Sequence, residues 1–323
     1  MVITKETELI IMLMQLPGFG SKISEIMANF MIENRLLDNI DIYSVIRDCV
    51  KNKLINPRKE ISYIDIQNAI DKSKEIIERS LKSDIMIVSK FDEDYPFMLR
   101  SIVGYKGESV SPVILNFKGN ISLLKEKKSI AIIGTRHPTI EGENAGMYYA
   151  KYFAEKGFNI VSGLALGCDA IAHKGALSVN GKTTAVLAHG LHMVSPKSNE
   201  YIAKEILDKD GLLLSEYLIG TPAFTTSFVE RDRLQAGLAI ATIVIQTGIK
   251  GGTMHAVRAA INNEKVLAAV SYKEQSVREN DNVVGNNHLI EQGAFPLRKA
   301  EDFYDFIRRD KSLQYKTNEL KLF

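Results

Sequence analysis

Cysteine is scarce in this chain, and so is any surplus of charge of one sign. The 323 residues include only two cysteines, Cys49 and Cys168, far apart and outside any CxxC pair. Disulfide frameworks and cysteine metal sites need more cysteines at closer spacing, so we expect neither, and we expect a reducing compartment. The 41 Lys and Arg against 39 Asp and Glu leave a net charge of +2. Nucleic acid could therefore bind only through a local basic cleft, because the surface as a whole is not basic.

Long apolar runs are absent as well. No stretch approaches the roughly 20 apolar residues that span a membrane, and the amino terminus lacks the pattern of a signal peptide. We therefore expect a cytoplasmic protein with no membrane partner. The hydrophobic content of 45% and charged content of 25% are ordinary for a globular protein. The length allows one large core beside a smaller domain.

The first 81 residues show an all-helical pattern. Apolar residues recur at helical spacing on both sides of the turn Leu16-Pro17-Gly18-Phe19-Gly20, and a charged helix is expected over 64–80. A helix, a P-G-x-G turn and a second helix resemble helix-hairpin-helix and sterile-alpha-motif-like modules, in which the N–H groups of the turn can face a DNA phosphate. The alternative is an αα-hairpin whose glycines only let the chain turn.

The remainder alternates strands with helices. Short apolar runs at 85–88, 94–99 and 112–120 predict extra strands and a turn. From Ser129 onward, strands over 130–133, 158–161, 184–188, 212–215, 241–245 and 266–270 are separated by helical patterns. This alternation predicts an α/β fold with a doubly wound, mainly parallel sheet covered on both faces.

Two turns in the segment from Ser129 to Ser178 predict a phosphate site. Gly134-Thr135-Arg136 follows the first strand of this segment, and Ser162-Gly163 follows the second. Glycine lets the backbone approach a ligand, the following helices offer free N–H groups, and turns at the carboxyl ends of neighbouring parallel strands form a ligand crevice. An arginine in that crevice favours a phosphate.

Several familiar enzyme and cofactor motifs are missing. No GxGxxG follows the first strand of that segment, and Gly181-Lys182-Thr183 lacks the earlier glycine and the following helix of a P-loop. His189 and His192 have no carboxylate or cysteine partner near them, so a metal site is not expected. Ser162, Asp169 and His173 lack the GxSxG elbow of a hydrolase. We expect no catalytic residues, no metal and no cofactor.

The segment from Phe228 to Arg233 offers a second basic element. An aromatic side chain followed by Arg231 and Arg233 near the start of a helix gives a stacking platform beside two phosphate-binding groups. The alternative is an exposed helix end whose arginines are neutralised by Glu230 and Asp232.

Taken in order, these motifs resemble the DprA/Smf family, with coverage from about Leu9 to Ile307. The matching segments are Leu16-Pro17-Gly18, Tyr95-Pro96, Gly134-Thr135-Arg136, Ser162-Gly163-Leu164-Ala165, Ala172-His173, Gly181-Lys182-Thr183, Ser215-Glu216-Tyr217, Phe228 with Arg231 and Arg233, and Gly285-Asn286.

The resemblance implies a helical domain over 1–81, an extended Rossmann-like domain over 82–310 and a short tail over 311–323. It also implies a non-catalytic homodimer that binds and protects single-stranded DNA and helps load a RecA-type recombinase during natural transformation. Carried over by position, the DNA pocket consists of Gly134, Arg136, Ser162, Gly163, Lys182, Phe228, Arg231 and Arg233.

Departures from the family pattern mark a divergent member. Asp232 stands where the family usually has Asn, Leu166 replaces a frequently basic residue, and Gln246 replaces a typical Glu. No winged-helix domain is expected after the α/β domain. The alternative function is a nucleotide-binding sensor or adaptor, for example in phage defence, using the same crevice.

The segment Lys250-Gly251-Gly252-Thr253 resembles the Gly-rich turn of the Lonely Guy phosphoribohydrolases, which supports the nucleotide alternative. Hydrolysis is not expected, because Ala256 or Val257 stands where that chemistry needs a carboxylate.

Overall fold

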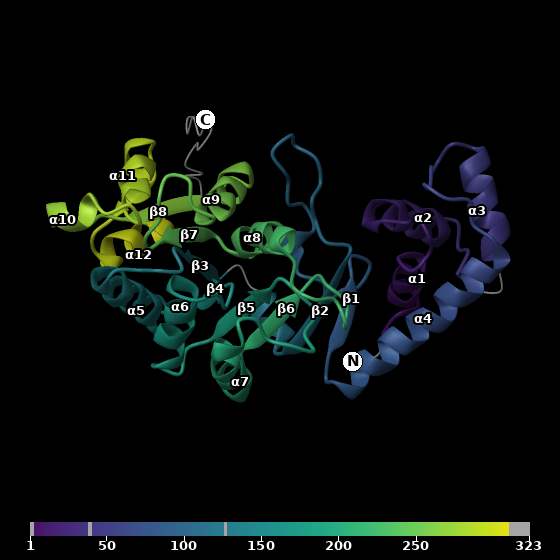
Figure 1. Ribbon diagram of the computed structural model, residues 1–323, viewed down its shortest axis with the longest axis horizontal. Helices are drawn as coiled ribbons and strands as arrows, with labels where there is room; N and C mark the ends of the chain where they lie inside the picture. Colours follow the sequence, from purple (N-terminus) through teal and green to yellow (C-terminus); the bar gives the residue numbers. More distant parts are fainter. Residues whose placement is uncertain (1–2, 38–40, 126–127, 310–323) are drawn as a thin grey trace.

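The computed structural model describes residues 3–37, 41–125 and 128–309. Within these ranges the chain forms a nine-stranded sheet covered by helices, with a bundle of helices α1 to α4 beyond one edge of the sheet (Figure 1). The α/β fold class is thus confirmed. The expected tail over 311–323 lies outside the described residues.

The strands are β1 (Met86–Ser89), β2 (Ile114–Gly119), β3 (Ser129–Ile133), β4 (Asn159–Ser162), β5 (Thr183–Leu187), β6 (Leu212–Ser215), β7 (Ala241–Val244), β8 (Val266–Val270) and β9 (Phe295–Leu297). The α-helices are α1 (Lys5–Leu13), α2 (Ser21–Glu33), α3 (Ile42–Lys51), α4 (Tyr63–Lys82), α5 (Ile140–Glu155), α6 (Cys168–Leu177), α7 (Glu200–Asp208), α8 (Thr225–Leu238), α9 (Thr253–Asn262), α10 (Gln275–Arg278), α11 (Val284–Glu291) and α12 (Ala300–Arg309). Short 3₁₀ helices are η1 (Phe97–Leu99), η2 (Ile121–Leu124) and η3 (Lys197–Asn199).

The sheet has the order β1-β2-β6-β5-β4-β3-β7-β8-β9. The pairs β1–β2 and β2–β6 are antiparallel, and every later pair is parallel. From β3 the chain builds outward through β4, β5 and β6, and then returns to place β7 on the other side of β3. The order therefore reverses between β3 and β7, and ligands bind doubly wound sheets at such a point.

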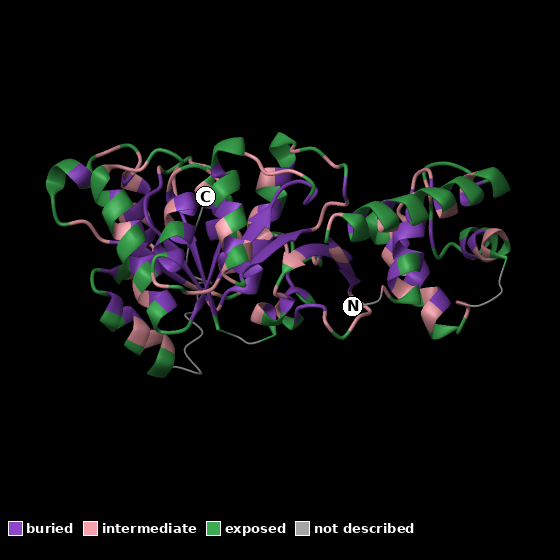
Figure 2. Cartoon of the chain, turned by 90° about the horizontal axis from the view of Figure 1, so that it is seen from below, coloured by how far each residue is buried: buried purple, intermediate pink, exposed green. Residues whose placement is uncertain are grey.

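The central strands are buried on both faces because helices cover both sides. Ile130 and Ile132 share an apolar cluster with Phe153 of α5, whereas Ile133 lies in a cluster with Val257 of α9. Figure 2 shows the strands as a buried layer between helices whose outer faces are exposed. This arrangement explains the nearly continuous apolar strands in the sequence.

The amino-terminal helices share a core with the sheet. One apolar cluster runs from Leu13 and Met27 to Ile87 and Ile114 in the first two strands. The predicted division between residues 81 and 82 falls in the last turn of α4, which begins with a capping box at Ser62.

The glycine turn between α1 and α2 has a packing role. Gly18 has a φ of 78°, and a Cβ atom there would lie 3.0 Å from the backbone nitrogen of Lys59. A side chain would be strained at this position. Packing alone therefore accounts for Gly18.

The three runs predicted as extra strands and a turn are all accounted for. The runs 85–88 and 112–120 correspond to β1 and β2, and 94–99 contains the turn η1, where Tyr95 and Leu99 are buried beneath α8. The short elements β9 and α10 were not predicted. Among the described helices, none has the length and apolar character required to cross a bilayer.

Candidate functional site

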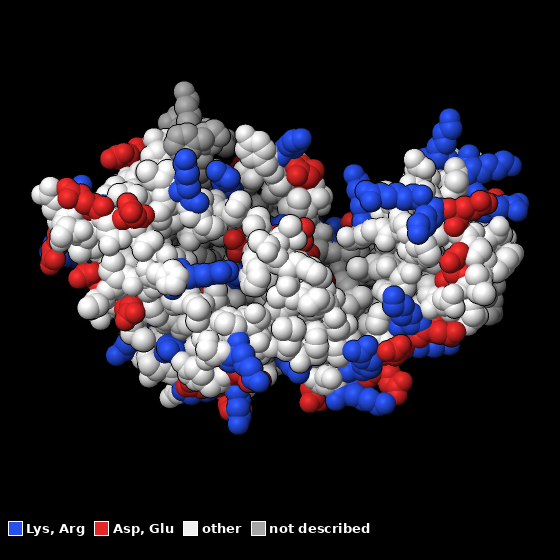
Figure 3. All heavy atoms as spheres, in the orientation of Figure 1, with Lys and Arg blue, Asp and Glu red and all other residues white. Residues whose placement is uncertain are grey.

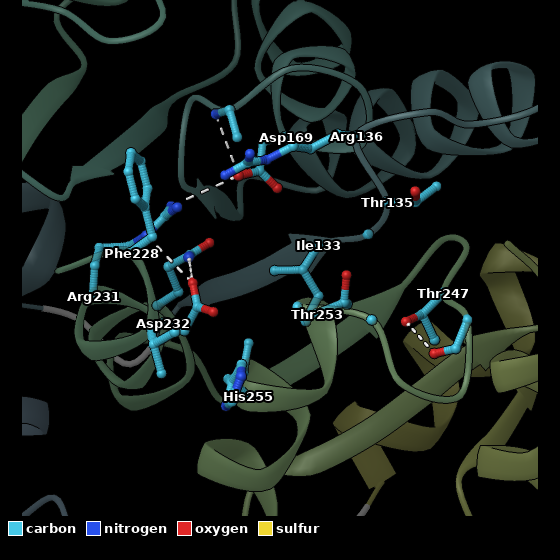
Figure 4. Close-up of a pocket in the computed structure, with 18 of the residues that line it drawn as sticks. Ile133, Thr135, Arg136, Asp169, Phe228, Arg231, Asp232, Thr247, Thr253 and His255 are labelled. Carbon is cyan, nitrogen blue, oxygen red and sulfur yellow. Dashed lines mark hydrogen bonds and ion pairs between the residues drawn. The ribbon is translucent and has the colours of Figure 1, made fainter. Parts of the chain in front are cut away.

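A pocket of about 570 Å³ opens at the carboxyl ends of β3 and β7, where the strand order reverses (Figure 4). Its walls come from the loop 134–137 after β3, the loop 247–252 after β7, Ala165 and Asp169 around the start of α6, α8 as far as Gln235, the first turn of α9, and Asn282. Its size is typical of small-molecule sites.

Arg136 and Phe228 meet at this pocket from opposite walls. The Arg136 guanidinium carbon lies 5.5 Å from the centre of the Phe228 ring. Arg136 is exposed and has no ion-pair or hydrogen-bond partner within the described part of the chain. Phe228 is partly buried, so its position is fixed by packing while its ring contributes to the pocket. The pair presents a free cation beside an aromatic surface.

Arg231 lies deeper, under the pocket. Its side chain is 95% buried, and Nη1 donates a hydrogen bond to the backbone oxygen of Val186 at 3.2 Å. Nη1 also lies 3.7 Å from Asp169 Oδ2, and Nε lies 3.4 Å from Asp232 Oδ1. Nε has no hydrogen-bond partner among the described residues. A Cβ atom at Gly163 would collide with this guanidinium, so only glycine leaves room for it.

One buried cation is therefore shared by two buried carboxylates. Burial raises the pKa of Asp232 to about 7, against the lowering effect of Arg231. Burial likewise raises the pKa of Asp169, although Arg231 opposes the shift. Asp232 Oδ1 accepts a hydrogen bond from Gln235 Nε2 at 3.0 Å. When both acids are ionised, Arg231 does not make the floor of the pocket positive.

The structure brings together only some of the residues predicted for this site. Gly134, Arg136, Phe228 and Arg231 line the pocket. Ser162 does not, because it is fully buried and its Oγ donates to the backbone oxygen of Ile132 at 2.7 Å. The opening only partly matches the predicted crevice between the turns after β3 and β4. Arg231 covers Gly163, but Ala165 and Asp169 farther along the segment after β4 line the pocket, and its other wall follows β7.

Lys182 lies at the opposite edge of the sheet, which corrects its predicted place in the pocket. It precedes β5, so it lies at the amino ends of the parallel strands, whereas the pocket lies at their carboxyl ends. Lys182 Nζ contacts Asp210 Oδ2 and the backbone oxygen of Lys209, each at 2.9 Å.

Arg233 also lies outside the pocket. Residues two apart on a helix do not share a face, so Arg231 and Arg233 point in different directions. Arg233 makes a two-pronged ion pair with Glu216, at 2.6 and 2.5 Å, and Nε donates to the backbone oxygen of Val110 at 2.8 Å. It joins α8 to the loops around β2 and β6.

The wall formed after β7 was predicted only for the nucleotide alternative, through Lys250-Gly251-Gly252-Thr253, and not for the DNA pocket. It supplies Thr247, Gly248, Gly251, Gly252, Thr253 and His255. The order of the segments along the sequence does not show that β7 lies next to β3 in the sheet. Gln246, one of the departures from the family pattern, connects the two loops: its Nε2 donates to Thr139 Oγ1, and its backbone oxygen accepts from Thr135 N, at 2.9 and 2.8 Å.

The histidines considered for catalysis or metal binding have local partners. His173 is fully buried with Nδ1 2.7 Å from Thr183 Oγ1, and burial lowers its pKa to about 3. His189 Nε2 accepts from Ser195 N, and His192 Nδ1 accepts from Gly220 N, each at 3.2 Å. In the ranges that the structure describes, no three His, Cys, Asp or Glu side chains gather as metal ligands would.

Comparison with known proteins gives a consistent result. The family model described as DNA recombination-mediator protein A matches residues 86–308. DNA processing protein DprA of Bacillus subtilis is 31% identical over 223 residues, which is 69% of this chain and 71% of that protein. Protein Smf of Escherichia coli is 30% identical over 213 residues, 66% of this chain and 54% of that protein. The chain thus matches about half the length of the E. coli relative.

Two solved structures are similar over long stretches. DprA from Streptococcus pneumoniae superimposes with a TM-score of 0.71 at 25% identity, over 94% of this chain and 98% of that one. DprA from Helicobacter pylori, whose structure is described as showing a single-stranded DNA binding mode, has a TM-score of 0.60 at 29% identity over 70% and 96%. The chain therefore belongs to the DNA recombination-mediator protein A family, the DprA/Smf family that its motifs resemble.

Proposed function

We propose that the protein binds single-stranded DNA in the pocket between β3 and β7 and acts in DNA recombination without a chemical step of its own. The observation that carries the proposal is Arg136, an exposed cation with no partner in the described chain, placed against Phe228 at the switch point of the sheet. Family membership and the DNA-binding relative from H. pylori support it.

The two side chains fit the two chemical parts of a nucleotide. An arginine pairs with a phosphate through charge-assisted hydrogen bonds. An aromatic ring stacks on a base of any sequence, and such stacking contributes about 1–3 kcal/mol per base. Gly134 lets the backbone approach the strand closely, while the charge of Arg231 is balanced by Asp169 and Asp232. Lys182 and Arg233 have no part in this proposal, because both are engaged elsewhere.

The proposal extends to the protein's role in the cell. It acts as a cytoplasmic homodimer that protects single-stranded DNA and helps load a RecA-type recombinase, including during natural transformation. The family description as a recombination mediator supports this role. Assembly of recombinase filaments on oligothymidylate, with and without this protein, would test it.

Arg136→Gln is expected to weaken binding of a fluorescently labelled oligothymidylate by roughly tenfold to a hundredfold, measured by anisotropy at low salt. Hydrogen bonds to charged groups contribute about 1.5–3 kcal/mol, and about 1.4 kcal/mol changes affinity tenfold. The matched control is Lys182→Gln, which removes the same charge and should leave the affinity within about twofold, because Lys182 lies at the amino ends of the strands, away from the pocket.

Equal weakening by both variants would mean that the protein attracts DNA only through its general charge. No binding by the parent protein at low salt would reject single-stranded DNA as the ligand.

A free nucleotide is the second candidate ligand. The volume of the pocket and the glycines at 251 and 252 beside Thr253 favour it, since a Gly-rich loop before a helix can hold a phosphate. Binding of a nucleoside monophosphate with no binding of oligothymidylate would support this function over the first.

A further inference from the structure

A second cavity adjoins the pocket at the start of α9. It has a volume of about 320 Å³ and is lined by Ile249, Lys250, Gly251, Met254, His255 and Arg258. Gly251 and His255 line both cavities. The two cavities are therefore neighbours, separated by the first turn of α9.

The side chains around the second cavity are basic and free. Lys250, His255 and Arg258 are all exposed, and none has a hydrogen-bond or ion-pair partner in the part of the chain that the structure describes. The lining contains no Asp or Glu. By contrast, the first pocket places Asp169 and Asp232 beside its buried arginine. Of the two cavities, the second therefore has the lining more favourable to an anion.

The basic groups also have a geometry that suits a strand. His255 and Arg258 are three residues apart on α9 and so share one face of the helix, while Lys250 comes from the preceding loop. In Figure 3, which has the orientation of Figure 1, Lys and Arg atoms lie over the region of α9. A row of cations that leads away from a pocket with an aromatic wall is the pattern of a groove for a nucleic-acid backbone.

We propose that the cavity lined by Lys250, His255 and Arg258 binds the phosphates of the same DNA strand whose adjacent nucleotide occupies the first pocket. The inference rests on the proposed function and makes the binding site longer than one nucleotide. Lys250 and Arg258 bind phosphodiester oxygens there, and the exposed ring of His255 lies where the strand crosses between the cavities.

The salt dependence of binding tests this inference. Affinity for a labelled 20-residue oligothymidylate is measured between 50 and 300 mM NaCl for the parent, for Lys250→Gln with Arg258→Gln, and for Lys72→Gln with Lys74→Gln. The last variant removes two exposed lysines from α4 and matches the change in net charge. Each phosphate contact on a single strand contributes about 0.7 to the slope of log K against log salt. The α9 variant should therefore lose about 1.4 from the slope and bind about tenfold more weakly at 100 mM, whereas the α4 variant should follow the parent.

The outcomes separate this inference from the proposed function. Two results with a parent that binds would reject the second cavity as a phosphate subsite and leave the DNA function intact. In one, both variants keep the slope of the parent; in the other, the α9 and α4 variants lose the same amount of slope. If the α9 variant loses binding at every salt concentration, these residues belong to the primary site, and the division into two subsites is wrong. If the parent itself does not bind, the DNA function fails and this inference fails with it. Thermal unfolding of the variants, all at exposed positions, should match that of the parent.

Discussion

Replacing Arg231 by methionine is expected to lower the free energy of unfolding by about 3–5 kcal/mol at pH 8, as measured by urea denaturation. The methionine fills similar space but leaves Asp169 and Asp232 buried without their shared cation. Removing one partner of a buried ion pair has a cost of this size, because the remaining charge stays out of water. The variant also loses the hydrogen bond from Nη1 to Val186.

Two controls make this result specific. Arg79→Met removes an exposed arginine paired with Glu75 on α4, and should change the free energy by less than about 1 kcal/mol. Adding Asp232→Asn to the Arg231→Met variant should recover part of the loss, because it removes one of the two unpaired charges. A loss below 1 kcal/mol for Arg231→Met, or no recovery in the double variant, would contradict the assignment of Arg231 as the shared counter-ion.

The fold could be predicted largely because its signals are local. Apolar runs such as Ile130 to Ile133 are buried on both faces wherever helices alternate with strands, so strand positions and the parallel sheet follow from the sequence. The strand β9 was missed because its three residues include Pro296 and give no period. The sequence did not show which of the three runs before Ser129 is the turn; in the structure it is the run around Tyr95, whose apolar side chains pack beneath α8 in a 3₁₀ turn.

The site was harder to predict because it depends on contacts between distant segments. Arg136 could be found from the turn after β3, and Phe228 from the helix start that carries it. The loop after β7 reaches the pocket because β7 lies beside β3 in the sheet, and no local sequence pattern predicts this order of strands. Arg231 and Arg233 look equivalent in sequence, but the helix points one under the pocket and the other toward Glu216. Lys182 was placed in the pocket only through the family resemblance, whereas its position just before β5 puts it at the amino end of that strand.

Asp232→Asn is expected to reduce a pH dependence of stability that the parent shows, while Asp169, whose pKa is also raised by burial, keeps part of it. Asp232 has a pKa of about 7 in the folded protein, raised from 3.8 by burial. At a pH between these two pKa values, Asp232 keeps its proton in the folded protein and has released it in the unfolded chain. The free energy of unfolding of the parent therefore falls as the pH rises from about 4 to 7. Three pH units at 1.36 kcal/mol each set an upper limit near 4 kcal/mol, and we expect on the order of 2–4 kcal/mol. Denaturation at pH 4.5, 6 and 8 should show this loss in the parent and a smaller one in the variant. Glu230→Gln, at an exposed position on the same helix, should behave as the parent does.

The same proton should couple to DNA binding. A phosphate bound beside Arg136 adds negative charge near Asp232, which raises the pKa of Asp232 further and favours uptake of a proton on binding. Affinity of the parent should therefore fall as pH rises above 7, by up to tenfold per pH unit, while the Asn variant should bind more tightly than the parent at pH 8 and depend less on pH. An equal pH dependence in both proteins would show that Asp232 does not hold the proton. A loss confined to the parent would show that Asp232 makes DNA affinity depend on pH near neutrality.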